Sequence, residues 1–305
     1  MHISISGGGA RGISAAAFFE RLEASAEGRR WLESCTHWSG VSAGALVATP
    51  LAMGISAKVL KEHVDNSGWN SRWYYPKALA TLIGWRDAMY DGQQMYHELV
   101  KTCKDRQLRA PLSIAVTDQH MQQKSLTYTC LNSIHSIANC AVASASVPGV
   151  FAARRVAPLN GLCLDGGAVR STFNVDAIIA SIRSGANVTL IHLAPWPQNP
   201  TIESTAPRRS RLFDAVFNTW NNHGLEFIQR ELGRSFQFQD GVFQFQNVLF
   251  IAPTSAQFVK SGGRARSGQL WYKPRSRTVE QLTQEGHHTA DCLLRFLKQS
   301  SVVSL

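Results

Sequence analysis

The sequence has no uninterrupted apolar stretch of the roughly 18 residues that a membrane-spanning helix needs, so we expect no segment to cross a bilayer. Charged residues are scarce at 17%, while hydrophobic residues reach 44%, and this balance excludes a disordered or fibrous chain. No internal repeat or low-complexity tract is visible, which excludes a repeat array. The 305 residues therefore fit one large globular domain with a substantial core.

Paired cysteine motifs are also missing. The six cysteines, at positions 35, 103, 130, 140, 163 and 292, form no C-x-x-C pair, and several lie within apolar runs. This pattern predicts reduced, buried thiols, as in cytosolic proteins, rather than a disulfide framework. A strand pattern that begins at His2 leaves no room for a signal peptide, so we expect a cytoplasmic protein with at most a peripheral membrane association.

Acidic residues are outnumbered, because 21 aspartates and glutamates stand against 31 lysines and arginines and give a net charge of +10. A basic surface favours acidic partners, either an anionic lipid surface or nucleic acid. The basic, glycine-containing stretch at residues 261–277 is a candidate for such contacts. A solvated basic surface without a partner explains the same composition.

Short apolar strand patterns alternate with helical patterns along the chain. The predicted strands cover residues 2–6, 36–41, 112–117, 125–131, 187–193 and 247–252. The predicted helices cover residues 13–26, 43–53, 56–64, 136–146, 174–184, 212–232 and 278–299. This alternation predicts an α/β fold with a mostly parallel central sheet sandwiched by helices, and functional loops at the carboxyl ends of the strands.

The most informative motif is Gly40-Val41-Ser42-Ala43-Gly44, at the junction of a predicted strand and a predicted helix. This is the context of a G-x-S-x-G nucleophile elbow, in which a serine is presented on a sharp turn. Gly40 and Gly44 fit because a Cβ at either position would collide with the strand or the helix. The helix N-terminus next to Ser42 favours developing negative charge. A plain tight turn is the alternative interpretation.

Two further motifs follow apolar segments in the same way. Gly7-Gly8-Gly9-Ala10-Arg11-Gly12 comes directly after the first strand, and Asp165-Gly166-Gly167 follows the apolar run at residues 162–164. Together the three motifs resemble the patatin-like phospholipase family, in which they occur in this order. Residues 143–151 also resemble that family's A-S-x-A-x-P-x-x-F stretch. The resemblance covers about residues 1–195, and we expect residues 196–305 to complete a single catalytic domain, 1–305.

The resemblance implies a lipid acyl hydrolase of the phospholipase A type, which cleaves fatty-acyl esters of glycerophospholipids. Ser42 would be the nucleophile, and Asp165 would be its base without a histidine between them. The implied oxyanion loop comprises Gly7, Gly8, Gly9, Ala10, Arg11 and Gly12, with the backbone N–H groups of Gly8, Gly9 and Ala10 as donors. Arg11 would hold the loop in shape or reach a substrate phosphate. Neither a metal nor a cofactor is implied.

Two other activities would use the same residues. A transacylase would transfer the acyl group to an alcohol in place of water, and a catalytically silent module would only bind lipid. In each case the expected partner is a phospholipid or another acyl lipid at an anionic membrane surface, and nucleic acid is disfavoured. The sequence specifies no protein or small-molecule activator.

Two rival sites also have to be weighed. The late histidines His287 and His288 would suit a Ser-His-Asp hydrolase, which also uses G-x-S-x-G, but they lie in a polar run typical of an exposed helix start. No third ligand stands at metal-binding spacing from them. The glycines of the first loop also match the dinucleotide fingerprint G-x-G-x-x-G, as a distant alternative. That motif needs an acidic residue at the end of the second strand, where this chain has Ser42 and its neighbours.

Residues 69–96 are rich in aromatic side chains with basic residues between them. The aromatic residues are Trp69, Trp73, Tyr74, Tyr75, Trp85, Tyr90 and Tyr96. Amphipathic rings next to basic residues are typical of a membrane interface, and in patatin-like enzymes the corresponding region covers the acyl pocket. We therefore expect a lid or a membrane-contact segment here, with ordinary core packing as the alternative.

Overall fold

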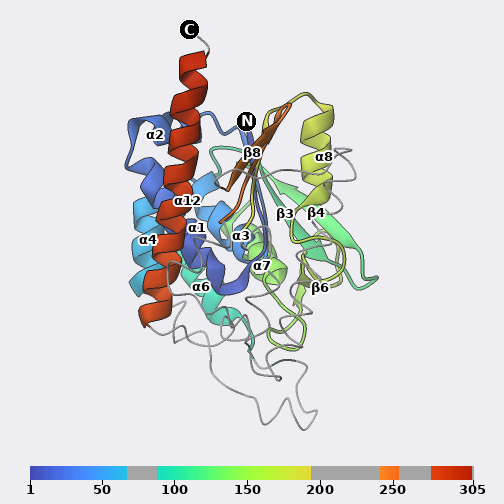
Figure 1. The fold of residues 1–305 in the computed structure, drawn as a ribbon. Helices are drawn as coiled ribbons and strands as arrows, with labels where there is room; N and C mark the ends of the chain where they lie inside the picture. The colour runs from blue at the N-terminus through green and yellow to red at the C-terminus, as the bar shows by residue number, and fades with distance from the viewer. Residues whose placement is uncertain (67–87, 89, 194–240, 254–275, 304–305) are drawn as a thin grey trace, which may run out of the picture.

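The computed structural model describes residues 1–66, 88, 90–193, 241–253 and 276–303 of the chain. Within these residues, nine strands form one mixed sheet in the order β5-β6-β3-β2-β1-β7-β9-β8, with β4 paired to β3 outside this path. Helices cover the sheet on both faces (Figure 1). The predicted α/β architecture is therefore confirmed.

The strands are short and mostly buried. In chain order they are β1 (His2–Ile5), β2 (His37–Val41), β3 (Leu112–Thr117), β4 (Gln123–Tyr128), β5 (Arg154–Arg155), β6 (Leu162–Asp165), β7 (Val188–Ile191), β8 (Val242–Phe245) and β9 (Val248–Ile251). The central strands β3, β2, β1, β7 and β9 run parallel to one another. Strands β4 and β6 pair antiparallel with β3, β5 pairs antiparallel with β6, and β8 pairs antiparallel with β9. The parallel centre is buried on both faces, as is usual for parallel sheets.

The helices form one large layer and one small layer around the sheet. They are α1 (Gly12–Glu23), α2 (Ala26–Glu33), α3 (Ala43–Ala52), α4 (Ala57–Asn66), α6 (Gln93–Thr102), α7 (Ile134–Ser144), α8 (Val175–Arg183) and α12 (Ser276–Val303), with the 3-10 turn η1 (Gly9–Arg11) before α1. Helices α1, α2, α4 and α12 pack against one another on one side of the molecule, and α8 stands apart from them next to β7 and β4 (Figure 1).

Side-chain caps explain where three of the helices begin. The side-chain oxygens of Ser25, Ser133 and Asn174 each accept the backbone N–H three residues later, at the starts of α2, α7 and α8. A capping oxygen satisfies a backbone donor that has no partner within the helix. The caps therefore fix the points at which the chain leaves an irregular segment and enters a helix.

Two apolar clusters lie on the two faces of the sheet. Ile3 and Ile5 of β1 belong to the larger cluster, which α1, α3, α7 and α12 cover. Val188 and Leu190 of β7, with Phe250 of β9, belong to the smaller cluster beneath α8. Alternate residues of a strand point to opposite faces, so each strand contributes to one cluster at every second position.

The structure differs from the sequence-based expectation in several elements. The helix predicted over residues 13–26 ends as α1 at Glu23, and Ser25 caps the N-terminus of a separate helix, α2, that was not predicted. Helix α6 and strands β5 and β8 were not predicted, and β6 was expected only as an apolar run. The helix predicted at residues 212–232 lies outside the described residues. The strand predicted at residues 112–117 is β3 with the same bounds, and the other predicted elements are present with shifted ends.

The cysteines are all free thiols. Four are buried, Cys35 is half-buried and Cys130 is exposed, so the expectation of buried thiols is wrong for Cys130. Among the helices that the structure describes, none has the length and apolar character to cross a membrane.

Candidate active site

Strand β3 brings two distant parts of the predicted site to neighbouring positions. Along one edge, β3 pairs with β4 over its whole length. Along the other edge, β2 pairs with β3 as far as Val41 opposite Ala115, and β6 takes over at the next β3 residue with Asp165. A Cβ on Gly166 would lie 2.2 Å from the Ala115 carbonyl oxygen and 3.2 Å from Val41 Cγ1, which places the β6 end at the β2 edge. Ser42 follows Val41 directly, so it lies next to Asp165 at the carboxyl end of the sheet.

Ser42 occupies a sharp turn between β2 and α3. Its φ of 54° and ψ of −125° lie outside the regions that a side chain prefers, at a cost of about 1–3 kcal/mol. Close packing holds the turn, because a Cβ on Gly40 would lie 2.6 Å from the backbone nitrogen of Ala45, and a Cβ on Gly44 would lie 2.3 Å from the Ile5 carbonyl oxygen. This is the geometry of a nucleophile elbow.

Asp165 is the last residue of β6 and is only 6% exposed. Its Oδ1 accepts the N–H of Gly167 at 2.8 Å, whereas Oδ2 has no hydrogen-bond partner of normal geometry among the described residues. Burial raises the pKa of Asp165 to about 6, although the nearby Ser42 hydroxyl and the Gly167 amide lower it in part. A carboxylate with this pKa and an open oxygen beside a serine hydroxyl can accept a proton near neutral pH.

The C-terminal end of α7 supports both residues. The N–H of Ser42 donates to Ser144 Oγ at 2.8 Å, and that hydroxyl donates to the Ala115 carbonyl oxygen at 2.6 Å. The N–H of Asp165 donates to the carbonyl oxygen of Ser146 at 2.9 Å. Sequence reasoning assigned no role to either α7-end serine, although both lie in the 143–151 stretch that carries part of the family resemblance.

The glycine loop lies against the nucleophile. A Cβ on Gly7 would lie 3.2 Å from Ser42 Cβ, so the loop passes directly beside this side chain. The N–H of Gly7 donates to the Thr172 carbonyl oxygen at 2.7 Å, whereas the N–H groups of Gly8 and Gly9 have no partner among the described residues. Gly9 has a positive φ of 56°, which turns the chain into η1 and α1. Unused donors therefore gather beside Ser42 at a helix N-terminus, where negative charge is stabilised.

Arg11 is turned away from this site. Its side chain is buried, with Nη1 donating to Glu285 Oε1 of α12 at 2.9 Å and to the Leu193 carbonyl oxygen at 3.3 Å. Burial raises the pKa of Glu285, and the guanidinium of Arg11 lowers it. Of the two predicted roles, the geometry favours holding the loop in shape over reaching a substrate phosphate.

The residue Gln123, which the sequence did not single out, contacts the segment after Asp165. Its Nε2 lies within hydrogen-bond distance of the carbonyl oxygens of Gly166, Ser171 and Phe173, at 2.7, 2.9 and 3.3 Å. Only the position of Gln123 between an exposed turn and β4 was visible from the sequence, so no local signal would have found it.

The rival sites have no support in the geometry. His287 Nε2 lies 3.3 Å from Glu20 Oε2 of α1, and His288 is exposed, so α12 presents neither imidazole to Ser42. No group of three or more histidine, cysteine or acidic side chains in the described parts of the chain is arranged to hold a metal ion. Strand β2 ends at Val41 and leads into the elbow, where a dinucleotide site would need an acidic residue.

The aromatic-rich segment is only partly described. Trp69, Trp73, Tyr74, Tyr75 and Trp85 lie outside the described residues, as does the basic stretch up to residue 275. Tyr90 is described, and its N–H donates to the Val150 carbonyl oxygen at 2.9 Å while its ring lies 5.5 Å from that of Phe151. The end of this segment is therefore joined to the loop that follows α7.

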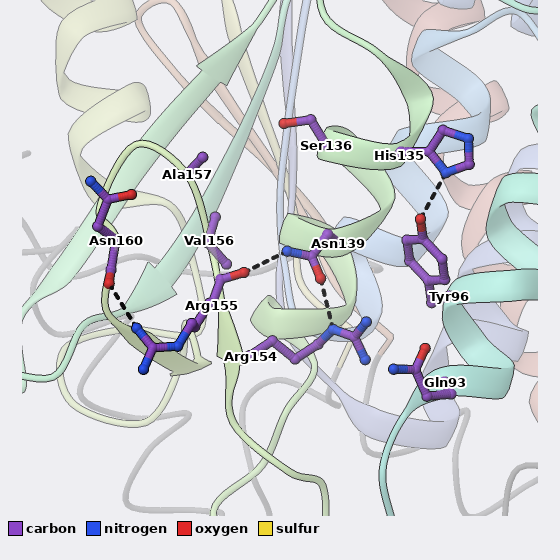
Figure 2. Close-up of a pocket in the computed structure, with 10 residues that line it drawn as sticks. All are labelled: Gln93, Tyr96, His135, Ser136, Asn139, Arg154, Arg155, Val156, Ala157 and Asn160. Carbon is purple, nitrogen blue, oxygen red and sulfur yellow. Dashed lines mark hydrogen bonds between the residues drawn. The ribbon is translucent and has the colours of Figure 1, made fainter.

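A cavity of about 810 Å³ lies between α6, α7 and β5 (Figure 2). Arg154 Nε donates to Asn139 Oδ1 at 2.9 Å, and the guanidinium lies 5.4 Å from the centroid of the Tyr96 ring. The Tyr96 hydroxyl is hydrogen-bonded to His135 Nδ1 at 2.7 Å. No residue of the predicted catalytic set lines this cavity, so it is separate from the Ser42 site.

A comparison with known protein families identifies the family of this chain. The family profile of patatin-like phospholipases matches residues 3–179, which is more than half of the chain. The protein therefore belongs to the patatin-like phospholipase family. The matched range contains the glycine loop, the Ser42 elbow and the Asp165 motif.

Two solved structures resemble this chain at low sequence identity. VipD from Legionella pneumophila is 16% identical over 98% of this chain, with a TM-score of 0.49. Human GIVD cytosolic phospholipase A2, in complex with methyl gamma-linolenyl fluorophosphonate, is 10% identical over 98% of this chain, with a TM-score of 0.53, and this likeness supports the fold alone. The present chain spans 66% and 59% of the lengths of those two chains. A comparison with curated proteins gave no match.

Proposed function

We propose that this protein is a lipid acyl hydrolase that cleaves fatty-acyl esters of glycerophospholipids, with Ser42 as the nucleophile and Asp165 as its base. The observation that carries the proposal is the shared edge of β3, where the last residues of β2 and β6, Val41 and Asp165, pair with consecutive β3 residues. This arrangement sets a strained serine beside a buried carboxylate. Membership of the patatin-like phospholipase family supports lipid hydrolysis as the class of reaction.

The first half of the reaction would form an acyl-enzyme. Ser42 Oγ attacks the ester carbonyl carbon while its proton passes to Asp165 Oδ2, the carboxylate oxygen that no described residue engages in a hydrogen bond of normal geometry. The tetrahedral intermediate collapses when the C–O bond of the ester breaks. The departing alcohol, a lysophospholipid, takes the proton from Asp165. The raised pKa of Asp165, about 6, suits both steps because the group accepts and returns a proton near neutral pH.

The intermediate carries a negative oxygen that needs donors. The backbone N–H groups of Gly8, Gly9 and Ala10 are proposed to supply them, at the N-terminus of the η1–α1 helical segment. Donors that are already in place cost no reorganisation when the charge develops, and each contributes on the order of 3 kcal/mol in a well-studied protease.

The second half of the reaction would release the fatty acid. A water molecule attacks the acyl-enzyme carbonyl carbon and passes a proton to Asp165 Oδ2. The ester bond to Ser42 Oγ then breaks, the fatty acid leaves, and Ser42 regains its proton from Asp165. The same residues would serve a transacylase if an alcohol replaced the water, and product analysis in the presence of an alcohol acceptor separates the two reactions.

Fatty-acid release from mixed phospholipid vesicles tests the proposal. We expect the native protein to release fatty acid, and both Ser42→Ala and Asp165→Asn to reduce the rate by at least about 10³-fold while they remain folded. A fatty-acyl fluorophosphonate should label the native protein at Ser42 and leave Ser42→Ala unlabelled. An active Asp165→Asn variant would show that another group is the base. Unlabelled native protein that still binds vesicles would instead indicate a silent lipid-binding module.

A further inference from the structure

Gln123 opens β4 at the edge of the proposed active site. It pairs across the sheet with Thr117, the last residue of β3, and is only 8% exposed. Its side-chain amide is directed at the segment that follows Asp165, where it reaches carbonyl oxygens at both ends of residues 166–173. A polar side chain that is buried in this way normally has a specific partner, because an unpaired buried amide is costly.

Three carbonyl oxygens define the orientation of this amide. The carbonyl oxygens of Gly166, Ser171 and Phe173 can only accept hydrogen bonds, so the group that faces them must be the NH₂ of Gln123. The other amide atom, Oε1, is buried without a partner among the described residues. The hydrogen bonds of the NH₂ group therefore fix the orientation of the Gln123 side chain, and this orientation leaves Oε1 without a partner among the described residues.

The segment that Gln123 holds carries two parts of the proposed catalytic machinery. At its start, the N–H of Gly167 donates to Asp165 Oδ1 at 2.8 Å. Near its end, the carbonyl oxygen of Thr172 accepts the N–H of Gly7 at 2.7 Å, the first residue of the glycine loop. A single short segment thus contacts both the proposed base and the proposed oxyanion loop.

The cross-strand partner of Gln123 acts on the same segment. Thr117 Oγ1 donates to the carbonyl oxygen of Asp165 at 2.8 Å, next to the Gly166 carbonyl oxygen that Gln123 holds. Two paired residues of β3 and β4 therefore hold two consecutive carbonyl groups, that of the proposed base and that of the next residue. This double attachment leaves little freedom at the point where the chain leaves β6.

We infer that Gln123 is a positioning residue of the hydrolytic site, which fixes the distance between the Asp165 carboxylate and the glycine loop through residues 166–173. The inference rests on the proposed function, because it assigns Gln123 no contact with substrate. Catalytic groups that move by about 1 Å lose on the order of 100-fold in rate, so a residue that sets this distance controls turnover rather than substrate affinity.

The variant Gln123→Met tests the inference, since methionine has a similar length and lacks the NH₂ donors. We expect kcat for vesicle phospholipid to fall about 10- to 100-fold with KM changed less than about twofold, because the loss lies in the transition state. The acid limb of the pH–rate profile should also shift to lower pH than in the native protein. A loosened segment admits water to Asp165, whose pKa is raised by burial and is otherwise affected by Ser42 and Gly167.

A matched control separates positioning from general destabilisation. Val64→Ala, in the buried face of α4, removes a core contact without touching the segment and should keep the native kcat and pH profile at a comparable loss of stability. Equal kcat values and pH profiles for the two variants would overturn the inference.

A second readout does not depend on activity. Hydrogen exchange at the amides of Gly7 and Gly167 should become faster in Gln123→Met than in Val64→Ala. The Gly7 amide donates to a carbonyl oxygen of the segment that Gln123 holds, and the Gly167 amide belongs to that segment. Unchanged exchange in Gln123→Met would overturn the inference even if the native protein were inactive. An inactive and unlabelled native protein with fast exchange in the variant would count against the proposed function alone.

Discussion

The backbone N–H of Ser42 is hydrogen-bonded to the side-chain hydroxyl of Ser144 at 2.8 Å, although Ser42 precedes α3, Ser144 ends α7, and the two residues are far apart in the sequence. Because Ser144 Oγ donates in turn to the Ala115 carbonyl oxygen, one hydroxyl joins the elbow to β3. The nucleophile is thus positioned by a residue that is not expected to touch the substrate. This relationship makes the end of α7 part of the machinery of the site.

Replacing Ser144 with alanine should uncouple the elbow from β3. The change leaves the Ser42 N–H and the Ala115 carbonyl oxygen buried without partners, so we expect Ser144→Ala to lose about 1–3 kcal/mol of unfolding free energy and to lower kcat. Ser146→Ala is the matched control, since this residue lies just after α7 and its hydroxyl donates to the Val142 carbonyl oxygen of that helix, not to the elbow or β3. Denaturant unfolding and fatty-acid release measure the two effects, and equal kcat values for both variants would contradict this role for Ser144.

Replacing the base should stabilise the protein in a pH-dependent way. The folded-state pKa of Asp165, about 6, lies above its ordinary value near 4, so the folded protein binds this proton more tightly than the unfolded chain. The native protein therefore loses stability as pH rises from about 4 to 6, and Asp165→Asn should not.

The size of this effect follows from the shift. At pH 7 we expect the unfolding free energy of Asp165→Asn to be up to about 3 kcal/mol higher than that of the native protein. This difference in unfolding free energy should vanish as pH falls from about 6 to 4. Urea unfolding over pH 4–8 measures it. A constant difference across that range would show that Asp165 ionises normally. The native kcat/KM should rise with pH through about 6 for the same reason.

The buried histidine of β1, His2, should make the protein sensitive to acid. Burial, with smaller effects of His37 and the N-terminal amine, lowers the pKa of His2 to about 3, and its Nε2 is hydrogen-bonded to Ser39 Oγ at 2.8 Å. The unfolded chain takes up this proton near pH 6.5, so the stability that the neutral imidazole gives is present above that pH and is lost as pH falls towards 3.

The variant His2→Gln isolates this contribution. Between pH 7 and pH 4.5 the native protein should lose about 2–3 kcal/mol of unfolding free energy through His2, and the variant should lose correspondingly less. Comparing the pH 7 to pH 4.5 difference, rather than absolute stability, removes the packing cost of the substitution and the opposite effect of Asp165. Identical differences in the two proteins would rule out His2 as the source of acid sensitivity.

The strain at the nucleophile should be measurable as stability. Ser42 has a φ of 54°, which glycine adopts without steric cost, so Ser42→Gly should unfold with about 1 kcal/mol more free energy than Ser42→Ala. Both variants lack the hydroxyl and should be inactive, which makes them a matched pair. Equal unfolding free energies would mean that the elbow stores no backbone strain.

Much of the site could be predicted from local sequence. A few residues are enough to predict a tight turn when glycines follow an apolar strand. Three such motifs resemble one family, and the family profile confirms that prediction. The α/β order followed from apolar periodicity in the same way. These features depend on contacts between residues close together in the chain.

The remaining features depend on residues that meet only in the folded chain. That β6 continues the β2 edge of β3 cannot be read from either strand alone, and it is what places Asp165 beside Ser42. The roles of Ser144 and Gln123 were missed because a buried polar side chain acquires its partner through tertiary contacts. Helix α2 was missed because the helical pattern before it continues past the Ser25 cap.

The ion pair between Arg11 and Glu285 joins the glycine loop to the last helix of the chain that the structure describes. The residues proposed to act on substrate all lie within residues 3–179, yet the buried charge of Arg11 is neutralised by a carboxylate from α12, which also packs so closely on α1 that a Cβ on Gly286 would lie 2.2 Å from the Ser14 carbonyl oxygen. Because synthesis starts at the N-terminus, the Arg11–Glu285 ion pair can form only after α12 has been made. A shorter chain that ends before α12 would carry the residues proposed to act on substrate without the carboxylate that neutralises Arg11.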